Sequence, residues 1–360
     1  LALCTANLPA PAVEDPSAFF QPQIYTGNGT AIASGGLAVT YDGNSDMTPD
    51  LVWIKNRETG DLHSIWDITR GVTQELHPDN NFVETTVAQG LTSFNSDGFT
   101  VGSDAANNTV NDSHASWSWN TQGGSGSSNT DGSINTTTTS VGQTQGMSIS
   151  TYTGTGSAAT IGHGLGVVPK CIMVKERTND VGNWFVYHEE VASDPQTDYL
   201  LLSLTNAKQD DATVWNDTAP TSSVFSIGTH DDVNGSSDTY VAYCWAEIPG
   251  FSKFGSYEGN GLANGSYVHL GFRAAFIICK SVDSTSSWLM YDSERVGYNP
   301  DNNALVAEAG TVEATTDQID ILSNGFKCRI ATDPNVSETY VYLAWAEHPS
   351  GSGVSQARAR

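Results

Sequence analysis

Three stretches of this chain end in the same kind of aromatic strand, and that repetition limits the folds open to it. The stretches are 114–120, 240–248 and 340–348, with tryptophans at Trp119, Trp245 and Trp345. A repeat of this length is a whole domain rather than one turn of a solenoid. The chain is therefore predicted to contain three modules.

The segments before each aromatic strand repeat in the same order. Each module opens with Tyr-x-Gly-x-Gly, at 25–29, 152–156 and 257–261. An apolar run ending in lysine follows, with the lysines at Lys55, Lys175 and Lys280, and then a second aromatic run. Matches in a fixed order in three copies predict three copies of one fold.

Composition indicates short strands rather than helices. The chain has Gly 35, is rich in Ser, Thr, Asn and Asp, and is only 15% charged; it shows no sustained 3.6-residue apolar period. We predict an all-β protein of three tandem antiparallel β-sandwich modules of the jelly-roll or lectin-like kind, each with its own core. The expected divisions are an N-terminal connector (1–19), module 1 (20–120), a Gly/Ser linker or long loop (121–133), module 2 (134–250), module 3 (251–349) and a flexible C-terminal tail (350–360).

Local signals place several strands. Apolar runs at 51–57 and 62–68 flank a Gly-containing turn, which predicts a hairpin. The Asp-Gly at 97–98 and the Asn-Gly at 324–325 predict matching turns in modules 1 and 3. Segment 134–141 is predicted to pair with 147–152. Trp117 and Trp119 alternate at a period of two, so both rings should lie on one buried face.

Charge and cysteine content exclude some classes of function. The formal charge of −25 argues against nucleic-acid binding, since a phosphate-binding surface needs Lys and Arg. The five cysteines, among them Cys4, have no Cys-x-x-Cys spacing, which predicts free buried thiols and folding in a reducing compartment. No apolar stretch approaches the ~18 residues of a membrane span. Because the sequence lacks an initiating Met, we expect a processed product or a piece of a longer protein.

The best enzyme candidates are Asp67, His188 and Asp292, at matched positions in the second hairpin strand of the modules. A catalytic carboxylate does not alternate with histidine unless its partners also change, so a structural or surface role is predicted. The common hydrolase, metalloprotease, phosphate-binding and dinucleotide motifs are absent from the sequence. We predict no enzyme activity, no catalytic residue and no cofactor.

A metal site is considered at 42–50, where Asp42, Asn44, Asp46 and Asp50 alternate like the ligands of a calcium loop. Met47 stands where such a loop has glycine, which favours an ordinary Asn/Asp turn. The eight histidines show no zinc-ligand spacing. No metal is predicted.

Trp184 and Trp288 are candidates for sugar stacking, against the alternative that they are core residues. Loops 104–113, 231–238 and 332–337 diverge between modules, and divergent loops on a repeated scaffold are the expected place for binding specificity. No individual ligand-binding residue is predicted.

Several phrases resemble a known group of proteins. They are Pro-Asp-Leu-Val-Trp-Ile-Lys-Asn-Arg at 49–57, Trp-Asp-Ile-Thr-Arg-Gly at 66–71, Phe-Asn-Ser-Asp-Gly-Phe-Thr-Val at 94–101 and Ile-Gly-His-Gly-Leu-Gly at 161–166. They resemble repeated β-sandwich modules of tail-fibre and other virion proteins of tailed bacteriophages, especially phages of marine bacteria. The opening at 1–9 resembles the exit from an upstream lectin-like domain. Module 2 departs from the pattern at the Asn/Asp-Gly-Phe position.

The resemblance implies a structural protein of the virion surface, assembled in the bacterial host cytoplasm and suited to a salty medium. It implies a homo-oligomer, with a trimer favoured, and contacts with other virion proteins. Three hypotheses stay open: adhesion to a host-surface glycan through module loops, a ligand-free architectural role as capsid decoration or fibre spacer, and a polysaccharide-degrading enzyme. The last needs paired carboxylates ~5 to 9.5 Å apart.

Overall fold

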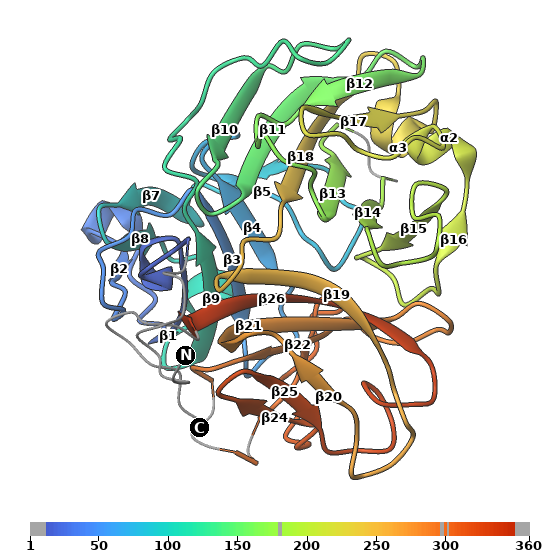
Figure 1. The fold of residues 1–360 in the computed structure, drawn as a ribbon. Coiled ribbons are helices and arrows are strands. Elements are labelled where there is room, and N and C mark those ends of the chain that lie inside the picture. Colours follow the sequence, from blue (N-terminus) through green and yellow to red (C-terminus); the bar gives the residue numbers. More distant parts are fainter. Residues whose placement is uncertain (1–11, 179–181, 296–298, 301, 350–360) are drawn as a thin grey trace.

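A computed structural model describes residues 12–178, 182–295, 299–300 and 302–349. It confirms the all-β prediction, because the regular structure of the described residues is almost entirely antiparallel sheet and the helices are single turns. Figure 1 shows the large sheets arranged around a common centre, with the smaller sheets outside them.

Module 1 pairs a large sheet of order β1-β9-β3-β4 with a small sheet of order β2-β8-β7, and β5 with β6 forms a further ribbon. Its elements are η2 (Pro16–Ala18), β1 (Phe20–Thr26), η3 (Ile32–Ser34), β2 (Leu37–Val39), β3 (Leu51–Asn56), β4 (Ser64–Asp67), β5 (Gln74–Glu75), β6 (Thr85–Thr86), β7 (Leu91–Asn95), β8 (Gly98–Val101), α1 (Ala105–Asn108) and β9 (Ser113–Trp119). The predicted hairpin is confirmed as β3 with β4.

Module 2 has a large sheet of order β10-β11-β18-β13-β14-β15-β16 and a small sheet of β12 with β17. Its elements are β10 (Thr138–Gly142), β11 (Met147–Thr153), β12 (Ala159–Gly162), β13 (Cys171–Glu176), β14 (Trp184–His188), β15 (Asp198–Leu201), β16 (Gln209–Asp210), α2 (Ala212–Trp215), β17 (Val224–Ile227), α3 (Asp231–Asn234) and β18 (Thr239–Trp245). The predicted pairing of 134–141 with 147–152 is confirmed for β10 with β11.

Module 3 has a large sheet of order β19-β26-β21-β22-β23 and a small sheet of order β20-β25-β24. Its elements are β19 (Ser252–Glu258), β20 (Tyr267–His269), β21 (Phe272–Ser281), β22 (Leu289–Asp292), β23 (Leu305–Val306), β24 (Ile319–Leu322), β25 (Gly325–Cys328) and β26 (Thr339–Pro349). In all three modules the closing aromatic strand lies inside the large sheet, between the opening strand and the lysine-ended strand.

The central strands of each large sheet are buried on both faces, which explains their unbroken apolar runs. In β3, Val52 and Ile54 face the small sheet of module 1 and join its local core. The alternate residues Leu51 and Trp53 point the other way, into a core that contains residues of all three modules. The modules therefore have their own cores, as predicted, and also share a central one, which the sequence did not predict.

The three repeated tryptophans meet in that shared core. The ring centroids of Trp119 and Trp345 are 5.2 Å apart, those of Trp245 and Trp345 are 6.0 Å apart, and those of Trp119 and Trp245 are 6.3 Å apart. All three pairs are edge-to-face, an arrangement favoured by the aromatic quadrupole. The prediction that Trp117 and Trp119 lie on a buried face is confirmed, and that face is the shared core.

The segments predicted as connectors also pack. Within the connector 1–19, the structure describes residues from 12 onward, and Val13 is buried in the shared core. Within 121–133, Thr121 is buried and Ser127 pairs with Thr139 of β10. This segment is a long loop along the edge of module 2. The predicted tail 350–360 lies outside the described residues.

Cys171, Cys244, Cys279 and Cys328 are free and buried, as predicted, and Cys4 lies outside the described residues. Burial raises the pKa of the Cys328 thiol to about 11, which keeps it protonated and unreactive at neutral pH. No helix in the described part of the chain is long and apolar enough to cross a membrane.

Candidate functional site

The matched carboxylates Asp67 and Asp292 lie at contacts between modules. Asp67 pairs with Arg70 of its own module and accepts a hydrogen bond of 2.6 Å from the hydroxyl of Tyr243 in module 2. Asp292 pairs with Arg295 and accepts a hydrogen bond of 3.0 Å from the indole Nε1 of Trp117 in module 1. Both carboxylates are buried, with guanidinium and aromatic donors already in place.

His188 occupies the same position in module 2, and its partner from the next module is different. Trp117 and Tyr243 each lie two residues before a core tryptophan, and in module 3 that position is Leu343, which has no donor. The Nε2 of His188 instead lies 3.2 Å from the Tyr342 carbonyl oxygen, and its Nδ1 accepts a hydrogen bond of 3.1 Å from the Glu190 amide. A carboxylate here would face a carbonyl oxygen, so the change from Asp to His follows the change of partner.

These bonds require the neutral tautomer of His188 with the proton on Nε2. Burial lowers the pKa of His188 to about 4, while the bond to the Tyr342 carbonyl partly opposes that shift. For Asp67, burial alone would raise the pKa, but the charge of Arg70 and the hydrogen bonds from Thr69 and Tyr243 outweigh it and lower the pKa.

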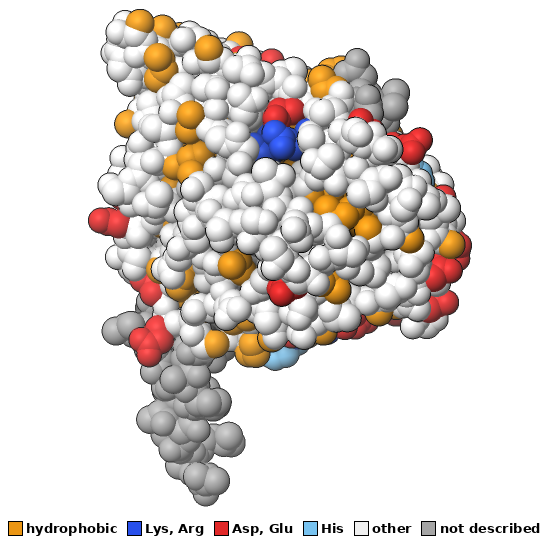
Figure 2. Space-filling model, turned by 90° about the horizontal axis from the view of Figure 1, so that it is seen from above, with side chains coloured by type: hydrophobic (Ala, Val, Ile, Leu, Met, Phe, Trp, Pro, Cys, Tyr) orange, Lys and Arg blue, Asp and Glu red, His pale blue; other side chains and the backbone are white. Residues whose placement is uncertain are grey.

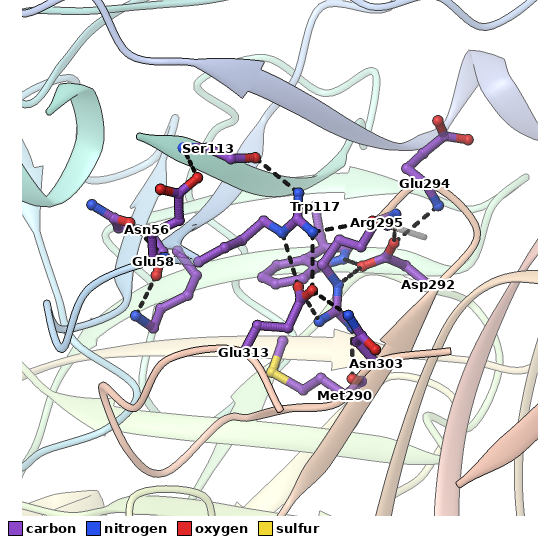
Figure 3. Close-up of polar contacts among 12 residues, drawn as sticks. Asn56, Glu58, Ser113, Trp117, Met290, Asp292, Glu294, Arg295, Asn303 and Glu313 are labelled. Carbon is purple, nitrogen blue, oxygen red and sulfur yellow. Dashed lines mark hydrogen bonds and ion pairs between the residues drawn. The ribbon is translucent and has the colours of Figure 1, made fainter. Parts of the chain in front are cut away.

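A four-residue ion network joins modules 1 and 3 (Figure 3). The Nε and Nη2 of Arg57 lie 2.8 and 2.9 Å from the two oxygens of Glu313, and the Nη1 of Arg295 lies 3.1 Å from one of them. Arg295 continues to Asp292, so two guanidinium groups face two carboxylates. Burial would raise the pKa of Glu313, but Arg57 and Arg295 lower it.

Modules 1 and 2 are joined by the same network. Arg177 takes the place of Arg57, Glu84 that of Glu313, and Arg70 that of Arg295. The Glu84 amide donates to the Arg177 carbonyl, as the Glu313 amide does to Arg57. Bidentate guanidinium–carboxylate pairs of this kind fix geometry strongly.

The junction between modules 2 and 3 lacks that network. Val282 occupies the position of Arg57 and Arg177. Val191 occupies the position of Arg70 and Arg295, and both valines are buried in the shared core. Lys208 replaces the central glutamate: its amide donates to the Val282 carbonyl, while its Nζ pairs with Asp198 at 2.7 Å. A polar groove of about 470 Å³ opens here beside Val191 and Val282. The residues at all three of these positions therefore differ from those at the other two junctions.

The lysines that end the apolar runs are structural too. Lys55, Lys175 and Lys280 are fully buried, and each Nζ donates to the carbonyl of the following residue. The Nζ of Lys55 also reaches the Thr59 carbonyl in the hairpin turn. Burial lowers the pKa of Lys55 and of Lys280 to about 8.

The Tyr-x-Gly-x-Gly motif is held by an asparagine from a loop predicted to diverge. Asn108 lies in loop 104–113, and its Oδ1 accepts from the amides of Asn28 and Gly29. In modules 2 and 3 the Oδ1 of Asn234 and of Asn335 accepts from the equivalent first amide, that of Thr155 and of Asn260. The first glycine, Gly27, has no room for a Cβ, which would lie 2.0 Å from the Thr109 oxygen.

The motif tyrosines complete this clamp. Tyr25, Tyr152 and Tyr257 each donate to the carbonyl just before the asparagine. The predicted divergence therefore holds for most of each loop but fails at one residue. The missed signal was an asparagine five or six residues before His114, Tyr240 and Tyr340.

The tryptophans considered for sugar stacking are core residues. Trp184 and Trp288 have no exposed surface, so neither ring can meet a pyranose. Their Nε1 atoms donate across module boundaries, to the carbonyls of His77 and Leu201 at 2.8 and 2.9 Å. The core alternative is correct for both.

A pocket of about 200 Å³ lies at the junction of modules 1 and 3, next to the ion network. Its lining is mostly polar and includes Gln21, Asp42, Asn44, Ser293, Glu294 and Glu347, with Phe20, Pro22, Ala275 and Ala346 as apolar parts. Ser293 is 5% exposed, and its Oγ has no hydrogen-bond partner within the described residues. In Figure 3 the carboxylate of Glu294 points away from the network.

The segment considered for calcium forms one rim of this pocket. Asp42 and Asn44 line it, while Asp50 is used elsewhere, accepting from the amide and hydroxyl of Thr121 at 2.8 and 2.6 Å. Burial raises the pKa of Asp50, against those two hydrogen bonds. Within the described ranges no group of three or more His, Cys, Asp or Glu is arranged to hold a metal ion.

A family model described as a domain of unknown function (DUF7483) matches residues 15–349. No curated protein matches the chain, and no solved structure does.

Proposed function

The chain belongs to this DUF7483 family. From the resemblance of its repeated phrases to tail-fibre modules, we propose that it is a structural protein of a tailed-phage virion surface, and from its pocket lining we propose that it binds a host glycan. We place the binding site in the pocket between modules 1 and 3. The observation that carries the proposal is the lining of that pocket, where amide, hydroxyl and carboxylate groups converge around the unpartnered Ser293 Oγ.

The chemistry of the lining suits a polyhydroxylated ligand. The amide of Asn44 and the hydroxyl of Ser293 can both donate and accept, and the carboxylate of Asp42 can accept from sugar hydroxyls. Glu347 at the same rim is ion-paired with Arg273 at 3.1 Å. Pro22 gives an apolar surface for a C–H face. Three carboxylates at the rim disfavour an anionic sugar, so the ligand is a neutral or amino sugar.

The arrangement supports binding rather than hydrolysis. A glycosidase needs two carboxyl groups flanking the bond to be cleaved, one of them free to act as an acid. Asp67 and Asp292 are buried and ion-paired. We therefore propose no enzyme activity.

The test is retention of the intact protein on an array of neutral, amino and anionic oligosaccharides. Asp42→Asn and Asn44→Ala should each weaken binding roughly tenfold, or about 1.4 kcal/mol. The control is Asp210→Asn, an exposed carboxylate of β16 in module 2. If no glycan class is retained, or if the pocket variants bind like the wild type, the adhesive function is wrong.

The second candidate is a ligand-free architectural protein. It is favoured by how many of the residues singled out from the sequence serve internal contacts, including Asp67, His188, Asp292, Trp184 and Trp288. Phage particles that carry both pocket substitutions and still adsorb normally to host cells would support it.

A further inference from the structure

One long segment of this acidic chain is almost free of charge. From residue 121 to 169 the only charged side chain is Asp131, although the chain as a whole has 15 basic and 40 acidic residues. His163, the one histidine in the segment, is buried, and burial lowers its pKa. The segment consists mainly of Ser, Thr, Gly, Asn and Gln.

Most of the uncharged segment contributes to one surface, which we call the neutral face (exposed residues of 121–144 and 166–168). Loop 121–133 runs beside β10 through the Ser127–Thr139 pairing and reaches β12 through Ile134 and Ile161. The loop after β12 joins them, because the Nε2 of Gln143 donates to the Gly164 carbonyl at 2.9 Å. These elements lie together at the top of Figure 1.

Figure 2 looks onto this end of the molecule. Uncharged atoms predominate there, most acidic side chains lie near the rim, and one group of Lys or Arg atoms lies beside acidic atoms in the upper part of the view. Val167 and Val168 add two neighbouring apolar side chains, 47% and 40% exposed. The face is held in shape by local hydrogen bonds, such as those from Ser128 to the Thr136 carbonyl and from the Asn129 amide to the Thr136 hydroxyl.

We propose that the neutral face is where a second copy of this chain docks, forming a two-fold dimer. Two molecules of charge −25 repel each other over most of their surfaces. The repulsion is weakest where both present the neutral face, and a two-fold axis brings the same patch of each copy together. Val167 and Val168 supply apolar area that becomes buried there.

The charge pattern sets the salt dependence of this dimer. No ion pair at the neutral face is lost as salt rises, whereas the repulsion between the rest of the two molecules is screened. Dimerisation is therefore stronger at about 0.5 M NaCl than at about 0.05 M. Association through charged patches would show the reverse order.

The experiment is sedimentation velocity of the full chain over a concentration series at both salt levels. The wild type is expected to dimerise, and the double variant Thr137→Asp with Thr144→Glu to dimerise at least roughly tenfold more weakly. Both side chains are exposed, so folding should be preserved. The control adds the same charge to module 3 as Ala263→Asp with Thr316→Glu, both exposed positions.

The control variant should dimerise like the wild type, apart from a small general effect of net charge. A protein that stays monomeric at both salt levels overturns the proposal. A dimer weakened equally by both double variants, or strengthened by low salt, also overturns it.

Discussion

Protonation of buried His188 should destabilise the protein as the pH falls from 6.5 to 4. In the folded state its Nδ1 accepts from the Glu190 amide and its Nε2 faces the Tyr342 carbonyl, so a second proton would break the first bond. In the unfolded chain the imidazole takes a proton freely, near its ordinary pKa of 6.5.

The magnitude follows from the two pKa values. Burial lowers the folded pKa of His188 to about 4, about 2.5 units below the ordinary value of 6.5. At 1.36 kcal/mol per unit, the full difference is about 3 kcal/mol. Because the folded pKa is depressed, this stability is fully present above pH 6.5 and is lost as the pH falls toward 4.

The assay is urea unfolding at several pH values for the wild type and His188→Asn. The variant should be less stable at pH 7, but its stability should depend less on pH between 6.5 and 4, by up to about 3 kcal/mol. His63, whose burial also lowers its pKa, adds the same trend to both proteins and cancels in the comparison. The control is His269→Gln, because His269 is exposed in β20.

An NMR titration provides the decisive measurement. If the His188 ring titrates near pH 6.5 in the folded protein, the assigned tautomer and the buried environment are both wrong. If the His188→Asn variant keeps the full pH dependence, the proton is taken up elsewhere.

Three further predictions concern the module contacts and use urea unfolding. Trp345→Ala should lower the free energy of unfolding by about 3–5 kcal/mol, because removing a buried indole leaves a cavity in the shared core. A decrease of less than about 1 kcal/mol would contradict a shared core. Tyr243→Phe should lower the free energy of unfolding by about 1.5–3 kcal/mol, because buried Asp67 loses a hydrogen-bond donor. The lowered pKa of Asp67 would then rise, so the variant should begin to lose stability at a higher pH than the wild type as the solution is acidified. Val282→Arg should lower the free energy of unfolding, because the new guanidinium would lie near Lys208. Adding Lys208→Glu to that variant should restore about 1–3 kcal/mol, because the two new side chains can form an ion pair. If the effects of the two substitutions simply add, the matched network is wrong.

Features that depend on neighbouring residues were predictable from the sequence. The β3–β4 hairpin, the β10–β11 pair and the buried position of Trp117 and Trp119 all follow from period-two alternation and turn residues. Asp67 and Asp292, predicted to have a structural or surface role because histidine replaces them in one copy, are buried in contacts between modules.

Contacts between modules were not predictable in the same way. An unbroken apolar run indicates a strand buried on both faces but does not show which elements cover each face, so it did not reveal that Trp53 faces a shared core. Glu313 and Arg57 are far apart in the chain, and nothing local marks them as partners. The pocket lining comes from both modules 1 and 3, so no single motif contains it.

The asparagine clamp lies between these cases. Asn108, Asn234 and Asn335 recur at nearly constant spacing before the closing strand, so the repeat contained the signal. It was hidden because the residues around each asparagine differ. A buried amide that satisfies several backbone groups restricts one position and leaves its neighbours free to vary.

The cyclic order of the contacts makes the three modules one structural unit. Module 2 donates Tyr243 to module 1, module 1 donates Trp117 to module 3, and module 3 presents the Tyr342 carbonyl to module 2. Each large sheet packs one face against its own small sheet and the other into the core shared with the other two modules. A single module released from this ring would expose that second face, including its core tryptophan, to water. Stability therefore depends on closing the ring, which explains why a change at one junction, such as Leu343, is accompanied by changes in the residues facing it.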